Sequence, residues 1–293
     1  NSTGASLTAV GSYALDANTT GNYNTAVGSS ALGANTTASN NTALGYSALY
    51  VNSTGSYNTA VGHEALTANT TGEQNVAMGR GALIANTTAS YSVAVGDSAL
   101  TSATTGGSNT AIGSAAGLSI STGSNLQAFG KDAARSGSPG GAATTGSNAV
   151  YIADENITAA YIQVDWTISS DERDKTDFTA LDLGLDFVKD LAPVTYKWDK
   201  RSNYINKNDP AVDLDKVVAD GTHKEDWLDI GFKAQEVEAL EKAAGYKMSD
   251  KTNLTTNLTH DGKQYGIQYN KFVPILVKAI QELSAEVEKL KGG

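Results

Sequence analysis

Short apolar triplets recur along the first half of the chain at a constant interval. Each triplet is an alanine, a larger apolar residue and a glycine, as in Ala26-Val27-Gly28. Successive triplets are 17 residues apart, and they begin at Ala9, Ala26, Ala43, Ala60, Ala77, Ala94, Ala111 and Ala128. A second apolar pair, such as Ala31-Leu32, keeps the same register. The pattern predicts repeated units, each with two very short apolar strands and two turns.

A unit of 17 residues cannot bury its apolar face alone, so identical units are expected to stack in register. The prediction for residues 1–135 is a parallel β-solenoid or β-roll that forms a stalk. Alanine and the larger residue after it suit a narrow interior, glycine supplies a positive-φ turn, and the asparagine and threonine rows are expected outside. Because one thin coil buries little surface, we expect three chains to share a core.

Asn-Xaa-Thr/Ser triplets recur in register with the repeat. They begin at Asn18, Asn35, Asn52, Asn69 and Asn86. Each matches a glycosylation acceptor. Because the triplets recur with the same period as the repeat, the favoured interpretation is structural: asparagine and threonine side chains stack along the stalk and form hydrogen bonds in the turns.

The pattern changes after residue 135, and nearly all ionisable groups lie in the second half of the chain. Such a shift in composition indicates a domain boundary. Residues 136–168 are predicted to be a glycine-rich break followed by connecting strands at Ala149–Ala153 and Ala160–Ile168. Residues 169–293 are predicted to form an α+β domain.

Two helices are predicted inside this domain, at about Leu181–Leu191 and at Ala234–Ala244, the second closed by Gly245. The polar stretch Asn203–Asp226 is expected to be a loop. Asn1 lies within a repeat, so further sequence is expected before it.

The end of the chain carries a heptad pattern. Apolar residues step by 3, 4, 3, 4 and 3 at Val273, Leu276, Ile280, Leu283, Val287 and Leu290. This spacing predicts a coiled-coil helix at about residues 270–291, with trimerisation as its role. The alternative is a single amphipathic helix packed on the domain, because Phe272 and Ile275 broaden the apolar face.

Composition excludes several classes of function. The net charge is −10, which argues against nucleic-acid binding because neutralising phosphates requires clustered lysine and arginine. The chain has no cysteine, so disulfides and zinc-thiolate sites are excluded. No apolar run is long enough for a membrane helix, and no membrane insertion is expected. His63, His223 and His260 are far apart, and Asp213–Asp220 lacks calcium-loop spacing, so neither a metal nor a cofactor is expected.

Motifs in the second half carry a resemblance to a known family. They are Ser170-Asp-Glu-Arg-Asp-Lys175, Gly231-Phe-Lys-Ala-Gln-Glu-Val237, and Tyr265-Gly-Ile-Gln-Tyr269 with Ala279-Ile-Gln-Glu-Leu283. In this order they resemble the intramolecular chaperone domain that ends many phage tail spikes and fibres. The 17-residue repeat resembles those of phage tail fibres and of trimeric autotransporter adhesin heads.

The resemblance implies the distal part of a phage tail fibre or spike for host attachment. It implies a homotrimer, a host-surface glycan or protein as receptor, and a virion protein assembled in the cytoplasm of the bacterial host. The chaperone domain would drive trimerisation and folding, then release itself.

Carried over to this chain, the resemblance makes Ser170 a nucleophile and Lys175 its base, with cleavage between Ser169 and Ser170. Asp171 and Arg173 would hold the loop. A hydroxyl needs a nearby base in order to attack, and a neutral lysine can serve. The enzyme class implied is a serine endopeptidase that acts once on its own chain.

One residue departs from the family pattern. The family usually has an apolar residue at the position of Asp174, and a carboxylate beside Lys175 favours the ammonium form, which cannot act as a base. Asp177 flanks Lys175 on the other side. The chaperone could therefore be retained without cleavage. Alternatively, the motif is a polar turn in which Asp171 caps a helix and Arg173 pairs with a carboxylate.

Two other classes compete with the fibre. A trimeric bacterial adhesin would end in a membrane β-barrel, and the charged heptads offer no such strands. A glycan-degrading spike would need paired carboxylates, whereas those of the stalk are scattered. The stalk tyrosines, such as Tyr23 and Tyr57, suit weak sugar stacking better than hydrolysis.

Overall fold

The computed structural model describes residues 3–135, 138, 140–154, 156–157, 160–161, 163, 168–205 and 213–292. The chain forms two compact units. The stalk unit comprises residues 1–158 with 201–218 and 259–263, and the C-terminal unit comprises residues 159–200, 219–258 and 264–293.

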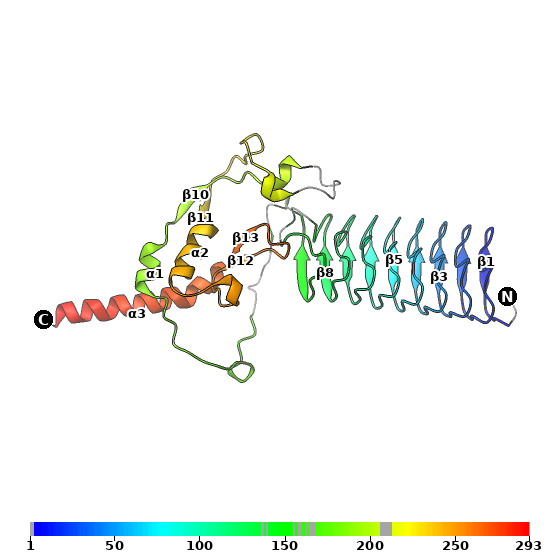
Figure 1. Ribbon diagram of the computed structural model, residues 1–293, viewed down its shortest axis with the longest axis horizontal. Coiled ribbons are helices and arrows are strands. Elements are labelled where there is room, and N and C mark those ends of the chain that lie inside the picture. The colour runs from blue at the N-terminus through cyan, green and yellow to red at the C-terminus, as the bar shows by residue number, and fades with distance from the viewer. Residues whose placement is uncertain are drawn as a thin grey trace. The chain divides into compact units, whose positions relative to one another are not determined.

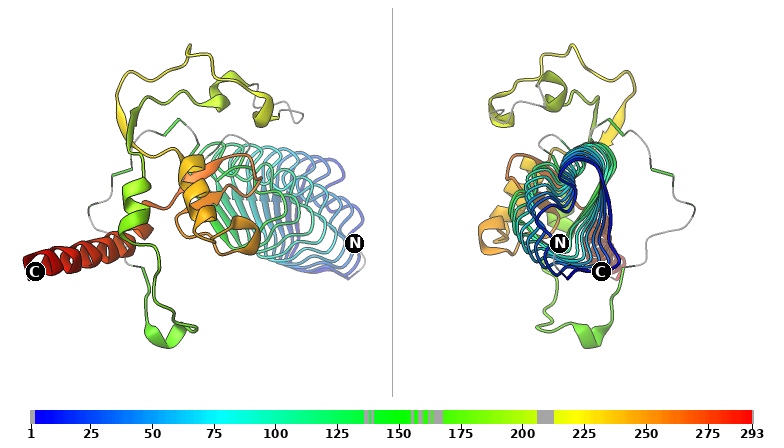
Figure 2. Two further views of the ribbon diagram at one scale, coloured as in Figure 1. Left: turned by 60° about the vertical axis from the view of Figure 1, so that its left-hand side comes forward. Right: turned by 90° about the vertical axis from the view of Figure 1, so that its right-hand side faces the viewer.

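The stalk unit is a parallel β-solenoid, which confirms the predicted fold class (Figure 1). Its strands are β1 (Thr8–Val10), β2 (Thr25–Val27), β3 (Thr42–Leu44), β4 (Thr59–Val61), β5 (Val76–Met78), β6 (Val93–Val95), β7 (Thr110–Ile112), β8 (Leu126–Phe129) and β9 (Ala149–Ile152). Neighbours in sequence pair in parallel, so Ala26 lies between Ala9 and Ala43. Along the stalk the coils lie one behind another with almost the same outline (Figure 2).

The triplets place only their alanine in the interior. Ala26, Ala43 and Ala60 are fully buried, whereas the larger residue after each alanine lies on the outer face of the sheet. The expectation that both residues fill the interior was therefore wrong for the second one. Successive strand residues point to opposite faces, so a buried alanine forces its neighbour outward.

The second apolar pair is not a strand. Each coil has one strand of three or four residues, and Ala31-Leu32 lies in a turn. Leu32 and Leu49 are fully buried and have φ values of 50° and 54°. A left-handed residue costs about 1–2 kcal/mol, but burying a leucine gains about 1.5–3 kcal/mol. Burial therefore outweighs backbone preference, which is why the two-strand prediction failed.

Asparagine side chains fill the interior beside the alanines, contrary to the expectation that they lie outside. Asn35 and Asn52 are fully buried, and Asn35 Nδ2 donates to Asn18 Oδ1 at 2.8 Å and to the carbonyl of Ala38 at 3.1 Å. The turns direct backbone carbonyls inward, and buried acceptors need donors. The amides supply them and link coil to coil. The stalk threonines are exposed or half-buried, as expected.

Glycine in the triplet is required by both conformation and space. Gly45 has a φ of 136°, and a Cβ there would lie 2.5 Å from the carbonyl oxygen of Gly62 in the next coil. The expected positive-φ role is confirmed, and it keeps adjacent coils at strand spacing.

Two later segments belong to the stalk unit. The 3₁₀ turn Leu214–Lys216 lies inside the stretch expected to be a loop, Asn203–Asp226, and the 3₁₀ turn Arg201–Tyr204 overlaps its start. Arg201 donates to the carbonyls of Leu214 and Lys263, both at 2.8 Å. The strand expected at residues 160–168 falls largely outside the described residues.

The C-terminal unit is a small α+β fold. Its elements are the 3₁₀ turn η1 (Glu172–Asp174), α1 (Leu185–Asp190), β10 (Val194–Tyr196), β11 (Asp229–Gly231), α2 (Ala234–Ala243), η4 (Met248–Asp250), β12 (Thr256–Leu258), β13 (Tyr265–Ile267), η5 (Tyr269–Lys271) and α3 (Phe272–Lys291). The pairs β10–β11 and β12–β13 are antiparallel. Leu183, Phe187, Val237, Phe272 and Ile275 form the core.

All three predicted helices are present, and α1 and α2 are shorter than predicted. Helix α1 spans six residues, so the expected start at Leu181 was four residues early. Helix α2 ends one residue before the expected Ala244, and Gly245, with a φ of 96°, follows its C-cap. The Gly245 N–H donates to the carbonyl oxygen of Lys242, and the Tyr246 N–H donates to the carbonyl oxygen of Glu241. This is the hydrogen-bond pattern of a Schellman cap.

A buried carboxylate fixes the start of β12. Glu241 is fully buried, and its Oε1 accepts hydrogen bonds from Thr255 N at 2.5 Å and Thr255 Oγ1 at 2.8 Å. The other oxygen accepts from the Thr256 hydroxyl. Hydrogen bonds offset the cost of burying this charge and tie α2 to the hairpin.

Candidate functional site

The candidate site is a short polar loop around η1. The Nζ atom of Lys175 lies 2.5 Å from Ser170 Oγ and 3.2 Å from the Ser170 carbonyl oxygen. The 3₁₀ turn Glu172–Asp174 folds the chain back between them and thereby brings the two side chains together. Both residues are exposed. This distance is within reach for direct proton transfer.

Asp171 and Arg173 brace the turn. Asp171 is the N-cap of η1, and Oδ1 accepts from Arg173 N–H at 2.9 Å. The Arg173 guanidinium also donates to Asp171, through Nε at 3.0 Å and Nη2 at 2.6 Å. These bonds to Arg173 lower the pKa of Asp171, and the same pairing raises the pKa of Arg173. The pair fixes the path of the chain between Ser170 and Lys175.

Asp174 and Asp177 do not engage the lysine. Both are exposed, and in the described loop, residues 168–178, no ion pair joins either carboxylate to Lys175. The Lys175 amine is directed to Ser170.

The alternative of a polar turn is also visible in part. Asp171 caps a 3₁₀ turn, and Arg173 pairs with a carboxylate, that of Asp171. Capping alone, however, does not require contact between Ser170 and Lys175. That contact is therefore additional to the cap.

Helix α3 presents two different faces. Phe272, Ile275 and Ala279 pack into the core and are at most 5% exposed. The heptad residues lie on an adjacent, partly overlapping face and are 38–82% exposed: Val273, Leu276, Ile280, Leu283, Val287 and Leu290. The packing face explains the alternative of a single amphipathic helix, but it leaves the heptad seam uncovered.

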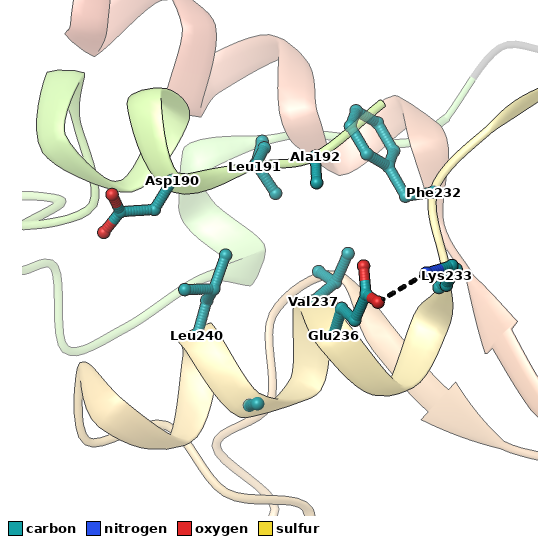
Figure 3. Close-up of a pocket in the computed structure, with 9 residues that line it drawn as sticks. Asp190, Leu191, Ala192, Phe232, Lys233, Glu236, Val237 and Leu240 are labelled. Carbon is teal, nitrogen blue, oxygen red and sulfur yellow. Dashed lines mark hydrogen bonds and ion pairs between the residues drawn. The ribbon is translucent and has the colours of Figure 1, made fainter. Parts of the chain in front are cut away.

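A pocket of about 280 Å³ lies between the end of α1 and the start of α2 (Figure 3). Leu191, Phe232 and Leu240 line it, and Lys233 and Glu236 pair at 2.7 Å on its edge. Its lining contains neither Ser170 nor Lys175, and its apolar walls suit packing better than catalysis.

The histidines and the acidic loop were the other candidate groups. Across the described residues no cluster of three or more histidine, aspartate or glutamate side chains could hold a metal ion. The ring of His63 stacks on Tyr46 at 5.1 Å, and the backbone N–H of His260 donates to Gly140. Of the helices in the described part of the chain, none combines the length and apolar character needed to cross a membrane.

Sequence reasoning missed two functional contacts. Glu282 on α3 accepts a hydrogen bond from the backbone N–H at the start of α1, and Glu241 supports β12 from the interior. Nothing local in the sequence marks either carboxylate, since each contact joins separate elements.

Residues 170–246 match the family model described as chaperone of endosialidase. The match begins at Ser170 and includes the first two motifs, ending before the third. No curated protein and no solved structure matches the chain. The family match and the β-solenoid together fit a phage tail fibre with a C-terminal chaperone domain.

Proposed function

We propose that this chain is the distal part of a phage tail fibre or spike for host attachment, and that its C-terminal chaperone drives trimerisation and folding. The chaperone then releases itself by cleavage between Ser169 and Ser170. The observation that carries the proposal is the 2.5 Å contact between Lys175 Nζ and Ser170 Oγ, at the residue where the family match begins.

The cleavage step uses only groups in this loop. Neutral Lys175 removes the hydroxyl proton of Ser170, and Oγ attacks the carbonyl carbon of Ser169. The peptide C–N bond breaks, the Ser170 nitrogen takes up a proton, and an ester joins the Ser169 carbonyl to Ser170 Oγ. Water hydrolyses the ester and leaves a carboxylate on Ser169 and a free amine and hydroxyl on Ser170.

Trimerisation is supported by apolar surface that one chain leaves uncovered. The heptad face of α3 is one such surface, with Ile280 66% exposed. The outer face of the stalk carries another, a continuous row on successive strands: Val10, Val27, Leu44, Val61, Met78, Val95 and Ile112. In a closed homotrimer every chain presents the same surfaces. Contacts between protomers at the heptad face and at the stalk row would bury both.

Release of the chaperone would leave the stalk kinetically trapped. Three solenoids packed together unfold slowly, and the released stalk no longer carries the domain that templated its assembly. Cleavage after assembly therefore makes folding irreversible.

The deciding experiment is intact-mass spectrometry of freshly expressed protein beside Ser170→Ala, with native mass measured on the same samples. We expect fragments ending at Ser169 and beginning at Ser170 in the wild type, an intact chain in the variant, and trimers in both. Ser169→Ala is the matched control, because it changes a neighbouring serine and keeps the nucleophile, so it should still be cut. An intact wild-type trimer would restrict the proposal to a retained chaperone, and a monomer would reject trimerisation.

A further inference from the structure

One surface row of the stalk combines aromatic and polar side chains. We call it the tyrosine row, and its members are Tyr23, Asn40, Tyr57, Gln74, Tyr91, Ser108 and Asn125. Each is 17 residues from the next, lies one or two residues before the strand of its coil, and is exposed. Tyr23, Tyr57 and Tyr91 are 65%, 58% and 63% exposed. Their rings are therefore available to a partner.

Backbone hydrogen bonds hold the row in register. The N–H of Tyr57 donates to the carbonyl of Ser39 at 3.2 Å, and the N–H of Tyr91 donates to that of Glu73 at 3.1 Å. The members share a left-handed backbone, with φ values of 62° and 63° for Tyr57 and Tyr91. Because every coil repeats this conformation, the side chains leave the stalk from equivalent points on a rigid scaffold.

The spacing of the tyrosines is set by the solenoid. Adjacent coils are about 4.8 Å apart, the distance between paired strands, so tyrosines in alternate coils are about 9.6 Å apart. In an extended polysaccharide, each pyranose ring advances the chain by about the spacing of one coil. Every second ring would therefore meet a tyrosine. Between the rings, Asn40 and Gln74 offer amide donors and acceptors to sugar hydroxyls.

The charge of the surface narrows the class of ligand. The tyrosine row contains no charged residue, and residues 1–135 carry Arg80, Lys131 and Arg135 against five carboxylates. A polyanion would find no cationic row to neutralise it. We infer that the tyrosine row is a binding site for a neutral, linear polysaccharide that lies along the stalk. The inference rests on the proposed function in host attachment and specifies its ligand and place.

Affinity would come from repetition. A single exposed ring stacked on a sugar binds weakly, but three equivalent rings on one polymer act as linked sites and raise the effective concentration for each next contact. A protein that presents the row in three copies would bind more tightly still.

The test uses the full chain and electrophoresis in native gels that contain dextran, mannan, galactomannan or hydroxyethyl cellulose, with alginate as the anionic comparison. The variant is Tyr23→Asn, Tyr57→Asn and Tyr91→Asn combined. Asparagine already occupies this row at Asn40 and Asn125 with φ values of 61° and 54°, so the backbone is preserved. The control removes three tyrosines from other rows: Tyr13→Ser, Tyr46→Ser and Tyr50→Thr.

We expect at least one neutral polysaccharide to retard the wild type and the control equally, and its affinity for the row variant to fall at least tenfold. The inference is overturned if no neutral polysaccharide retards the wild type, if alginate alone does so, or if the row variant is retarded equally. It is also overturned if native mass spectrometry shows a different oligomeric state for the row variant, because the row would then be a contact between protomers.

Adsorption of the labelled chain to bacterial cells separates this inference from the proposed function. Equal adsorption of wild type and row variant would reject the tyrosine row and leave host attachment in place. Absence of adsorption by the wild type, on strains whose polysaccharides it binds in gels, would count against host attachment and leave the row intact.

Discussion

The carboxylate of Glu282 on α3 accepts a hydrogen bond of 2.7 Å from the backbone N–H of Leu185, the first residue of α1 and 97 positions earlier in the chain. A carboxylate at a helix N-terminus satisfies a free N–H and complements the helix dipole. Lys278 pairs with the same side chain at 3.2 Å. One residue thus joins the last helix to the first helix of the C-terminal unit.

The carboxylate of Glu282 should make the stability of the wild type depend on pH, and replacing it should remove that dependence. The hydrogen bond from Leu185, followed by that from Lys278, lowers the pKa of Glu282 below its ordinary 4.5. A depressed pKa means that the stabilisation is fully present above 4.5 and is lost as the pH falls through the lowered folded-state value. Glu282→Gln should therefore denature at lower temperature than wild type at pH 7, and the difference should shrink in acid. A difference that is constant from pH 7 to pH 3 would contradict this origin.

The buried asparagine row should show a cost that depends on position. Asn52 donates to Asn35 Oδ1, so Asn52→Ala leaves that buried oxygen without its donor. Asn86→Ala orphans Asn69 Oδ1 in the same way but also removes Asn86 Oδ1, which already has no partner. An orphaned buried group costs about 1–3 kcal/mol, so Asn52→Ala should destabilise the stalk by about that much more than Asn86→Ala. Equal denaturation midpoints for the two variants would argue against the ladder.

The triplet glycines should tolerate no side chain. Gly45→Ala brings a Cβ to within 2.5 Å of the Gly62 carbonyl oxygen at a φ of 136°, and such strain costs at least about 1–3 kcal/mol. Gly81→Ala is the matched control, because its Cβ would have open space and the same row already holds Ala115 at a φ of 55°. We expect thermal denaturation to distinguish the two sharply. Similar midpoints would mean that the coils adjust their spacing.

Self-cleavage should require a base that can lose its proton. Lys175→Arg keeps a positive charge and a donor near Ser170, but a guanidinium does not deprotonate in proteins. The variant should remain intact by mass spectrometry while still assembling. Cleavage of the arginine variant at the wild-type rate would remove Lys175 from the reaction.

The heptad seam should control assembly without supporting the isolated fold. Ile280 is 66% exposed in the single chain, so Ile280→Asp should cost the monomer little. In a trimer the three carboxylates would meet at the seam, and native mass spectrometry should show monomers. Lys289→Asp introduces the same residue at an exposed polar position of α3 and should stay trimeric. An unchanged mass for Ile280→Asp would assign the seam another role.

The 17-residue period determined the stalk by itself. Eight triplets in strict register leave few ways to stack other than a parallel solenoid, and the glycine positions follow from the sharp turn of each coil. The heptad spacing likewise predicted α3, and Gly245 predicted the end of α2. The motif from Ser170 to Lys175 placed the candidate site. These features are local or repeat at a fixed interval, so the sequence contains them directly.

Only the tertiary structure decided which side chains face inward. The same period is compatible with Asn35 inside or outside, and closure of the coil selects the inside because its carbonyls need donors. Leu32 adopts a left-handed backbone because burial outweighs its local preference. Glu282 finds Leu185 only after two distant helices pack, and Lys175 reaches Ser170 through the turn between them. Contacts of this kind depend on three-dimensional closure, which no local pattern records.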